Sequence, residues 1–159
     1  YGRLVVGALA LAWCGDFLLG LSSQRAFLVG LAAFLVGHLV YVAAFGARGL
    51  VVSVVALSAG VVMLVGVAVW RWLHPHLDRR MLRPVAAYVV VVSAMVAAAL
   101  GTHGWLTDWR IVAGAIAFFL SDLFVARERF VSSGFSNRMW GLPLYYSGQI
   151  LLALSVGTI

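Results

Sequence analysis

The chain consists of apolar runs of about 20 residues joined by short polar connections. A run of that length is enough for a helix to cross the hydrocarbon core of a bilayer. We predict six such helices, over about residues 3–21, 26–46, 50–72, 83–101, 109–127 and 139–158. The connections leave no room for a soluble domain. The predicted fold class is therefore all-α: a polytopic transmembrane helix bundle in which residues 1–159 form one domain.

The composition excludes a soluble protein. Of the 159 residues, 64% are hydrophobic and 10% are charged, whereas soluble domains are about half apolar and about a quarter charged. All 11 basic residues are arginines, and most lie between the apolar runs, where they face anionic headgroups rather than nucleic acid. We therefore predict a multi-pass protein of a bacterial-type inner or plasma membrane, with membrane lipids as partners and with no nucleic acid and no cofactor. Cys14 is the only cysteine, so no intrachain disulfide is expected.

The arginines also predict an orientation. One side of the membrane would carry three of them: Arg3, Arg48 and Arg110. The other side would carry eight: Arg25, Arg71, Arg79, Arg80, Arg83, Arg127, Arg129 and Arg138. Cytoplasmic connections are enriched in basic residues, so we predict that the second side is cytoplasmic and that both ends of the chain face outward.

Two carboxylates lie inside apolar runs, which is costly in a membrane unless the group faces a bundle interior or a wet cavity. Asp16 lies in LALAWCGDFLLGL and Asp122 in IAFFLSDLFVA. Each would lie roughly 7 Å from the cytoplasmic end of its helix. Polar residues of other helices are expected roughly 7–14 Å from the same end, namely Tyr88, Tyr146 and Gln149. Two acids at matched depth favour a functional pair over the alternative, that each is structural and capped by a neighbour.

Several other residues have less specific interpretations. His38 shares a helical face with Phe34 and Tyr41 and is predicted to point toward the same interior, near the midplane. Asp108 and Glu128 are interpreted as solvated charges at helix ends, and HPHLD (residues 74–78) is not expected to bind a metal. Aromatic residues near the helix ends are predicted at the membrane interface: Tyr1, Trp70, Trp72, Trp105, Trp109 and Trp140.

Four motifs in order resemble the YhhN-type integral membrane family, which includes the lysoplasmalogenases. They are CGDFLLGL, FLVGHLVYVAAF, GAIAFFLSDLFVARERF and PLYYSGQILLAL, and the resemblance covers essentially the whole chain. The family is typically eight-helical, with a Lys-Pro motif in its first two spans. This chain opens with YGRLVV, without Met or a signal peptide, so we expect it to be a fragment.

The resemblance implies hydrolysis of the vinyl ether bond of a lysoplasmalogen, a lysophospholipid, to a fatty aldehyde and a glycerophospho-base. It implies Asp16 and Asp122 as the catalytic acids. It also implies that further polar residues line the substrate site: His38, Tyr41, Tyr145, Tyr146 and Gln149. The depth argument adds Tyr88 to these residues.

The chemistry agrees with the residues. Vinyl ether hydrolysis starts with proton transfer to the terminal vinyl carbon and passes through an oxocarbenium ion. It needs one protonated carboxylic acid and benefits from one ionised carboxylate, as in glycoside hydrolysis. No metal or nucleophilic serine is required. Two alternatives remain, a proton-coupled transporter of small molecules or lipids that uses the buried Asp and His residues as a relay, and a non-catalytic scaffold.

Overall fold

The computed structural model describes residues 1–102 and 108–158 and shows a bundle of long helices. In this part of the chain the α-helices are α1 (Gly2–Leu19), α2 (Gln24–Ala47), α3 (Val52–Leu73), α4 (Arg79–Gly101), α5 (Trp109–Ala126) and α6 (Phe135–Leu154). Short turns of other helical types follow three of them: η1 (His74–His76), η2 (Arg127–Val131) and η3 (Ser155–Thr158). Trp105, one of the predicted interfacial aromatics, lies outside the described residues.

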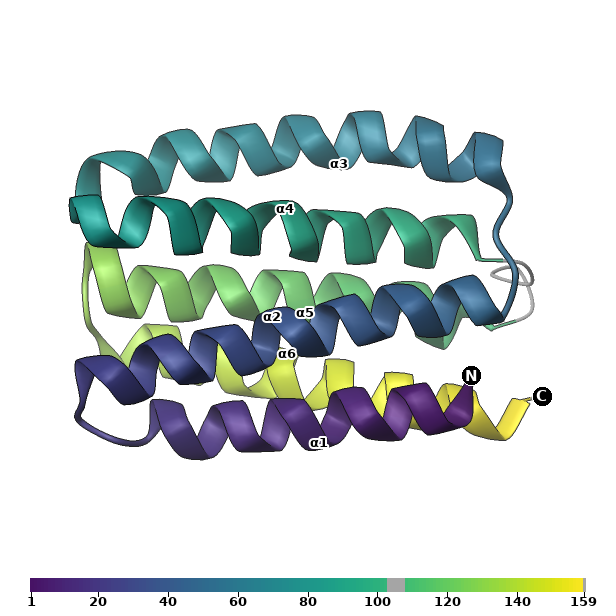
Figure 1. Ribbon diagram of the computed structural model, residues 1–159, viewed down its shortest axis with the longest axis horizontal. Coiled ribbons are helices and arrows are strands. Elements are labelled where there is room, and N and C mark those ends of the chain that lie inside the picture. Colours follow the sequence, from purple (N-terminus) through teal and green to yellow (C-terminus); the bar gives the residue numbers. More distant parts are fainter. Residues whose placement is uncertain (103–107, 159) are drawn as a thin grey trace.

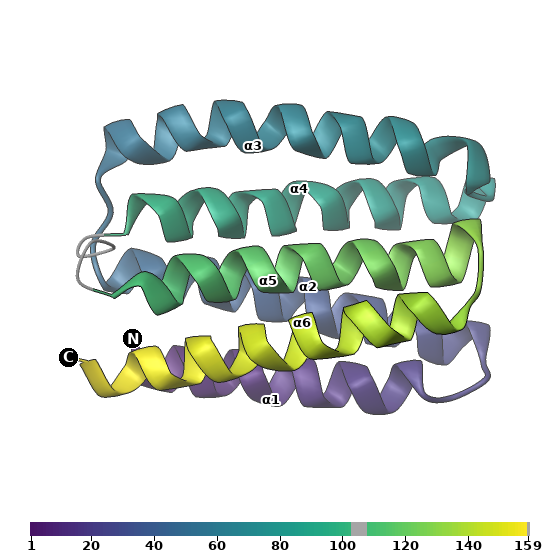
Figure 2. The same cartoon turned by 180° about the vertical axis from the view of Figure 1, so that it is seen from behind.

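Successive helices run in opposite directions, and both termini lie at the same end of the bundle (Figures 1 and 2). Each odd-numbered helix packs against the helix that follows it, and α4 also packs against α2 and α5. Helix α3 lies at the outer edge of the bundle (Figure 1), and only Gly66 and Leu73 of it are buried. The centre is therefore formed mainly by α2, α4 and α5, with α1 and α6 closing the opposite side.

Five helices are long and apolar enough to cross a membrane: Gly2–Leu19, Gln24–Ala47, Val52–His76, Arg79–Gly101 and Trp109–Val131. This confirms an all-α membrane bundle, but with five such spans in the described chain where the sequence predicted six. Helix α6 is not among them because Asn137, Arg138 and Gln149 lower its mean hydropathy. It nevertheless packs along α5 and α1 inside the bundle.

Two of the three prolines lie inside α-helices. Helix α4 begins at Arg79 and α6 at Phe135, each four residues before the predicted start, so that Pro84 and Pro143 lie inside helices. Proline has no N–H for the i→i−4 bond and crowds the preceding turn, yet both helices continue through it.

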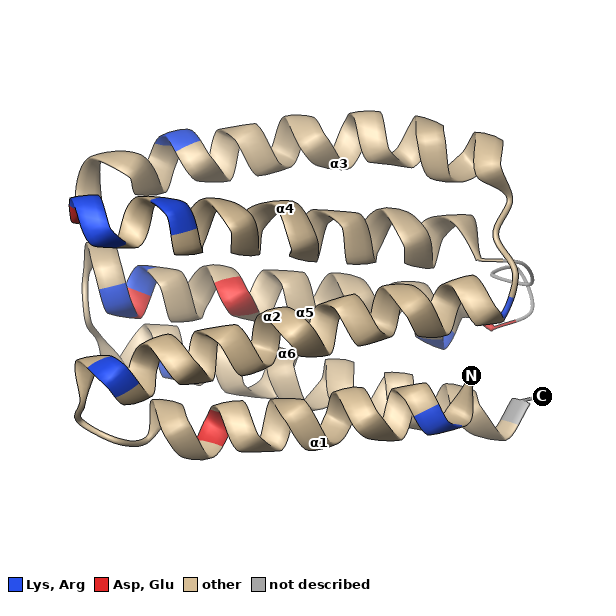
Figure 3. Ribbon diagram, in the orientation of Figure 1, with Lys and Arg blue, Asp and Glu red and all other residues tan. Residues whose placement is uncertain are grey.

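The arginines are concentrated at the end where α1 meets α2, α3 meets α4 and α5 meets α6, as Figure 3 shows. We call this the arginine-rich end; it is the end with the eight arginines of the predicted cytoplasmic side. The chain termini lie at the opposite end (Figure 1).

Helices α5 and α6 approach most closely at two glycines. A Cβ added to Gly148 would lie 2.9 Å from the carbonyl oxygen of Gly114 and 3.1 Å from the amide nitrogen of Phe118. Both neighbours are backbone atoms, which cannot rotate away. Small residues at such crossings let membrane helices pack backbone to backbone.

We expect Gly148→Ala to lower the free energy of unfolding in detergent by about 1–3 kcal/mol, the usual cost of overpacking. Thermal unfolding followed by circular dichroism would measure this change. Gly60→Ala is the matched control, because a Cβ there meets nothing within 4 Å. Equal unfolding temperatures for the two variants would contradict the close α5–α6 crossing.

The arginine count predicts that Arg79, which is exposed at the start of α4, faces the cytoplasm. In a protein with Cys14 replaced by Ser, we expect an impermeant thiol reagent added to intact cells to label Arg3→Cys and to leave Arg79→Cys unlabelled. The opposite labelling would invert the orientation and place the arginine-rich end outside.

Candidate active site

A cavity of about 670 Å³ lies among the helices near the arginine-rich end. Its walls are mainly aliphatic and aromatic side chains from all six helices, including Leu31, Phe34, Val69, Val92 and Phe119. Four polar side chains reach it from within the bundle: Asp16, Tyr88, Asp122 and Tyr145. Four others line it from the connection between α5 and α6 and the first turn of α6: Glu128, Arg129, Asn137 and Arg138. The cavity thus combines an apolar interior, an embedded pair of acids and a charged mouth.

Asp122 on α5 receives groups from two other helices. The Tyr88 hydroxyl of α4 donates to its Oδ2 at 3.1 Å, and Nε2 of His38 of α2 lies 3.5 Å from the same oxygen. The Asp122 side chain is 15% exposed and that of His38 1%. This partly exposed carboxylate therefore has one hydrogen-bond donor and one potential ion-pair partner.

The tautomer of His38 follows from its other nitrogen. Nδ1 lies 2.6 Å from the backbone oxygen of Phe34, and a carbonyl can only accept, so Nδ1 carries the hydrogen. In the neutral ring Nε2 is then an acceptor, and it makes no hydrogen bond to any described residue. Two acceptors 3.5 Å apart repel unless a proton lies between them. A proton on either atom would make this contact attractive.

Asp16 on α1 ends a different hydrogen-bond chain. Its Oδ2 accepts from the Tyr145 hydroxyl at 2.7 Å. That hydroxyl accepts from Nε2 of Gln149 at 2.8 Å, and Oε1 of Gln149 accepts from the Tyr41 hydroxyl at 3.2 Å. The donors all point toward the carboxylate. Asp16 thus has a single donor on one oxygen, whereas Asp122 has a hydroxyl and an imidazole.

Aromatic rings fix the groups that contact the two acids. The ring centroid of Phe118 lies 4.7 Å from that of His38 and 5.3 Å from that of Tyr145, and both pairs are edge to face. Phe34 packs on Phe118 and Tyr145 in the same way. Phe118 is buried, so the imidazole and the phenol are held in place by packing as well as by hydrogen bonds.

Comparison with known proteins agrees with this architecture. The sequence model of the YhhN family matches residues 1–156. The chain belongs to the YhhN family. It is 37% identical over 155 residues to a protein of Mycobacterium bovis named lysoplasmalogenase, covering 91% of this chain and 56% of that protein. It is 34% identical over 161 residues to the human lysoplasmalogenase TMEM86B, covering 98% of this chain and 64% of that protein.

The chain thus spans little more than half to about two thirds of the length of these relatives. No solved structure matches it. Family membership together with the five candidate spans identifies a multi-pass membrane protein similar to lysoplasmalogenases.

The structure brings most of the proposed site residues of this YhhN protein together. Asp16, Tyr88, Asp122 and Tyr145 line the cavity directly. His38, Tyr41 and Gln149 lie behind them and reach the acids through the contacts given above. His38, expected nearer the midplane than the acids, is adjacent to Asp122 itself.

Tyr146 lies elsewhere. Its side chain is 56% exposed, and it does not line the cavity, on whose wall it was expected. Consecutive helical residues point about 100° apart, so Tyr145 and Tyr146 cannot both face the interior. The buried one is Tyr145, and the ring of Tyr146 packs on its outer side at 5.2 Å.

Glu128 is partly exposed, as expected for a charge at a helix end, but it also has specific partners. Its Oε2 accepts from the amide of Gly134 at 2.8 Å and from Nδ2 of Asn137 at 2.7 Å, and Arg138 lies 3.6 Å away. This carboxylate therefore ties η2 to the start of α6 at the mouth of the cavity. Sequence reasoning missed it because its partners follow a turn whose geometry the residue pattern does not specify.

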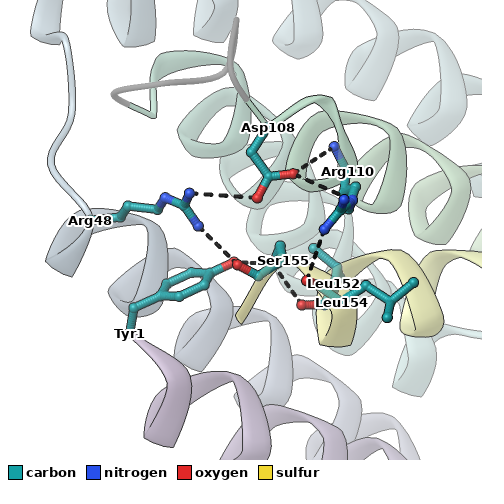
Figure 4. A network of polar contacts seen from close by, with 7 residues as sticks. All are labelled: Tyr1, Arg48, Asp108, Arg110, Leu152, Leu154 and Ser155. Atoms are coloured by element: carbon teal, nitrogen blue, oxygen red, sulfur yellow. Dashed lines mark hydrogen bonds and ion pairs between the residues drawn. The ribbon is translucent and has the colours of Figure 1, made fainter. Parts of the chain in front are cut away.

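Asp108 differs from the expectation, because it is only 3% exposed. It pairs with Arg48 at 3.5 Å and with Arg110 at 4.0 Å, as Figure 4 shows. Both arginines also donate to backbone oxygens at the end of α6, and the Tyr1 hydroxyl contacts Ser155. This polar cluster joins α1, α2, α5 and α6 at the end of the bundle opposite the arginine-rich end (Figures 1 and 4).

Proposed function

We propose that this YhhN protein hydrolyses the vinyl ether bond of a lysoplasmalogen-type lipid, giving a fatty aldehyde and a glycerophospho-base. One observation carries the proposal: two carboxylates on different helices line a single apolar cavity and have unlike partners. The similarity to proteins named lysoplasmalogenase supports it. The reaction needs one carboxyl group that carries a proton and one that carries a charge, and unlike environments are how proteins separate these roles.

Asp16 is the proposed proton donor. Only its Oδ2 has a hydrogen-bond partner among the described residues, the Tyr145 hydroxyl, so Oδ1 is available to carry a proton toward the cavity. Transfer of this proton to the terminal vinyl carbon breaks the carbon–carbon π bond and leaves a positive charge shared by the adjacent carbon and the ether oxygen. The surrounding apolar walls exclude bulk water from this step.

Asp122 is the proposed ionised partner. Tyr88 donates to its Oδ2, and a proton on Nε2 of His38 would do the same, so the negative form is the one that its neighbours stabilise. In that form it stabilises the oxocarbenium ion and accepts a proton from the water that adds to it. The resulting hemiacetal loses the glycerol oxygen as an alcohol, which takes the proton from Asp122. The hydroxyl proton of the hemiacetal returns to Asp16 as the aldehyde forms, so both acids regain their starting states.

A proton-coupled transporter is the second candidate, because a buried Asp122–His38 pair also suits a relay and Pro143 lies within α6. The two functions separate in one assay. Protein in detergent has no gradient to use, so a transporter would release no aldehyde from 1-alkenyl-glycerophosphocholine. A rate of aldehyde release that saturates with substrate concentration would establish that the protein is a hydrolase.

We expect Asp16→Asn and Asp122→Asn each to lower kcat by about 10²–10⁴-fold, the usual contribution of a positioned acid or base. Asparagine keeps the volume and removes the proton donor or the charge, so the protein should remain folded. Asp78→Asn, the same change at an exposed residue outside the cavity, is the control and should retain wild-type activity. Retention of more than about a tenth of the activity in either cavity variant would refute the mechanism.

We expect His38→Ala to lower kcat by less than the factor of about 10² predicted for the acids, because His38 acts through Asp122 and does not touch the substrate. It is a positioning residue, and a double-mutant cycle tests that role. In the Asp122→Asn background, removal of His38 should have little further effect on kcat. An equal loss in the Asp122→Asn and wild-type backgrounds would show that His38 acts independently of Asp122.

A further inference from the structure

A second hollow, of about 330 Å³, adjoins the mouth of the cavity. The two share four lining residues: Leu19, Gly20, Phe27 and Arg129. The rest of the hollow is the turn between α1 and α2, with Leu21, Ser22 and Ser23. The lining of this hollow is more polar than that of the cavity, with the hydroxyls of Ser22 and Ser23 beside the Arg129 cation, and it also lies at the arginine-rich end. It is therefore suited to the polar end of a ligand whose apolar part lies in the cavity.

Arg129 is held in place by two contacts. Its guanidinium carbon lies 4.3 Å from the centre of the Phe27 ring, and its Nη2 donates to Oε1 of Gln24 at 2.9 Å. Gln24 in turn is fixed by a contact of its Nε2 with the sulfur of Met81 at 3.8 Å. The side chain is thus positioned over the shared rim, and within the described part of the chain its Nε and Nη1 hydrogens are left for other acceptors.

The other arginine at the cavity mouth has a carboxylate partner, and Arg129 has none within the described chain. Arg138 pairs with Glu128 at 3.6 Å. Arg127, nearby on η2, donates to Oδ1 of Asn137 at 2.7 Å. No ion pair involves Arg129 among residues 1–102 and 108–158. A fixed guanidinium without an acid, facing two adjoining hollows, is an arrangement that binds an external anion.

We propose that Arg129 and the hydroxyls of Ser22 and Ser23 form a binding site for the phosphate of a single-chain phospholipid whose hydrocarbon chain occupies the cavity. The depth agrees with the chemistry. Asp16 lies three residues from Leu19, so it is about one helical turn, roughly 5 Å, below the shared rim. In a lysoplasmalogen the vinyl ether directly follows the glycerol that carries the phosphate. A phosphate at the rim therefore brings that bond toward the acids. The placement of the vinyl ether next to the acids rests on the proposed function.

Substrate kinetics test the site. We expect Arg129→Gln to raise KM for 1-alkenyl-glycerophosphocholine by about 10- to 100-fold with little change in kcat, as for the loss of a charged hydrogen-bond donor. For 1-alkenyl-glycerol, which lacks the phosphate, the variant and the wild type should have the same KM. Arg129→Lys should recover part of the loss. Arg25→Gln, at an exposed residue that lines neither hollow, is the control and should match the wild type. An equal effect of Arg129→Gln on both substrates would overturn the proposal.

A binding measurement separates this proposal from the proposed function. Saturated lysophosphatidylcholine has no vinyl ether, so its binding, followed by tryptophan fluorescence, does not depend on catalysis. We expect Arg129→Gln to weaken its binding by about the same 10- to 100-fold, and to leave binding of a monoacylglycerol of equal chain length unchanged. This result without aldehyde release in any assay would refute the hydrolase and retain the site. Binding of inorganic phosphate at Arg129 with no effect of Arg129→Gln on lysophosphatidylcholine would identify a free-anion site and overturn the proposal.

Discussion

The burial of two carboxylates in an apolar bundle is the constraint on which the rest of the structure depends. Each acid needs hydrogen-bond donors, since an unpaired charge in a membrane protein interior is costly. The partners come from other helices: the Tyr88 hydroxyl of α4 donates to Asp122, the Tyr145 hydroxyl of α6 donates to Asp16, and the His38 ring of α2 lies 3.5 Å from Asp122. Because Gln149 and Tyr41 extend the second chain back to α2, five helices are tied to the two acids. Apolar helix faces have little preference for particular partner helices. The polar network therefore specifies how these helices are arranged.

The two ends of the bundle use charge differently. At the end with the termini, Asp108 is nearly inaccessible and its pairs with Arg48 and Arg110 join four helices (Figure 4). At the arginine-rich end, Arg138 is 71% exposed and pairs with Glu128 at the mouth of a cavity. One end is thus closed by a compact polar cluster, and the other combines exposed cations with an opening. This asymmetry suits a ligand that enters from the headgroup layer on one side of the membrane.

The sequence specifies the helices better than it specifies their contacts. Apolar runs predicted all six helices to within about four residues, because the length of a run and its flanking polar residues are local properties. The choice between Tyr145 and Tyr146 was not predictable from depth alone, since both share the same layer and only the packing of α6 against α5 decides which faces inward. The burial of Asp108 and the partners of Glu128 were not predicted for a similar reason. Their partners become neighbours only through the turns and helix ends of the folded chain.

The unlike surroundings of the two acids provide the strongest physical support for a division of roles between them. Asp122 faces a hydroxyl donor and an imidazole that can also donate to a charged carboxylate, whereas Asp16 receives a single hydroxyl on one oxygen and can keep a proton on the other. The tautomer of His38 is fixed by the Phe34 carbonyl, so this difference is built into α2 and does not depend on a ligand. Since vinyl ether hydrolysis needs a proton at one carbon and a negative charge beside the next, an arrangement of unlike acids matches that requirement better than a symmetric pair would.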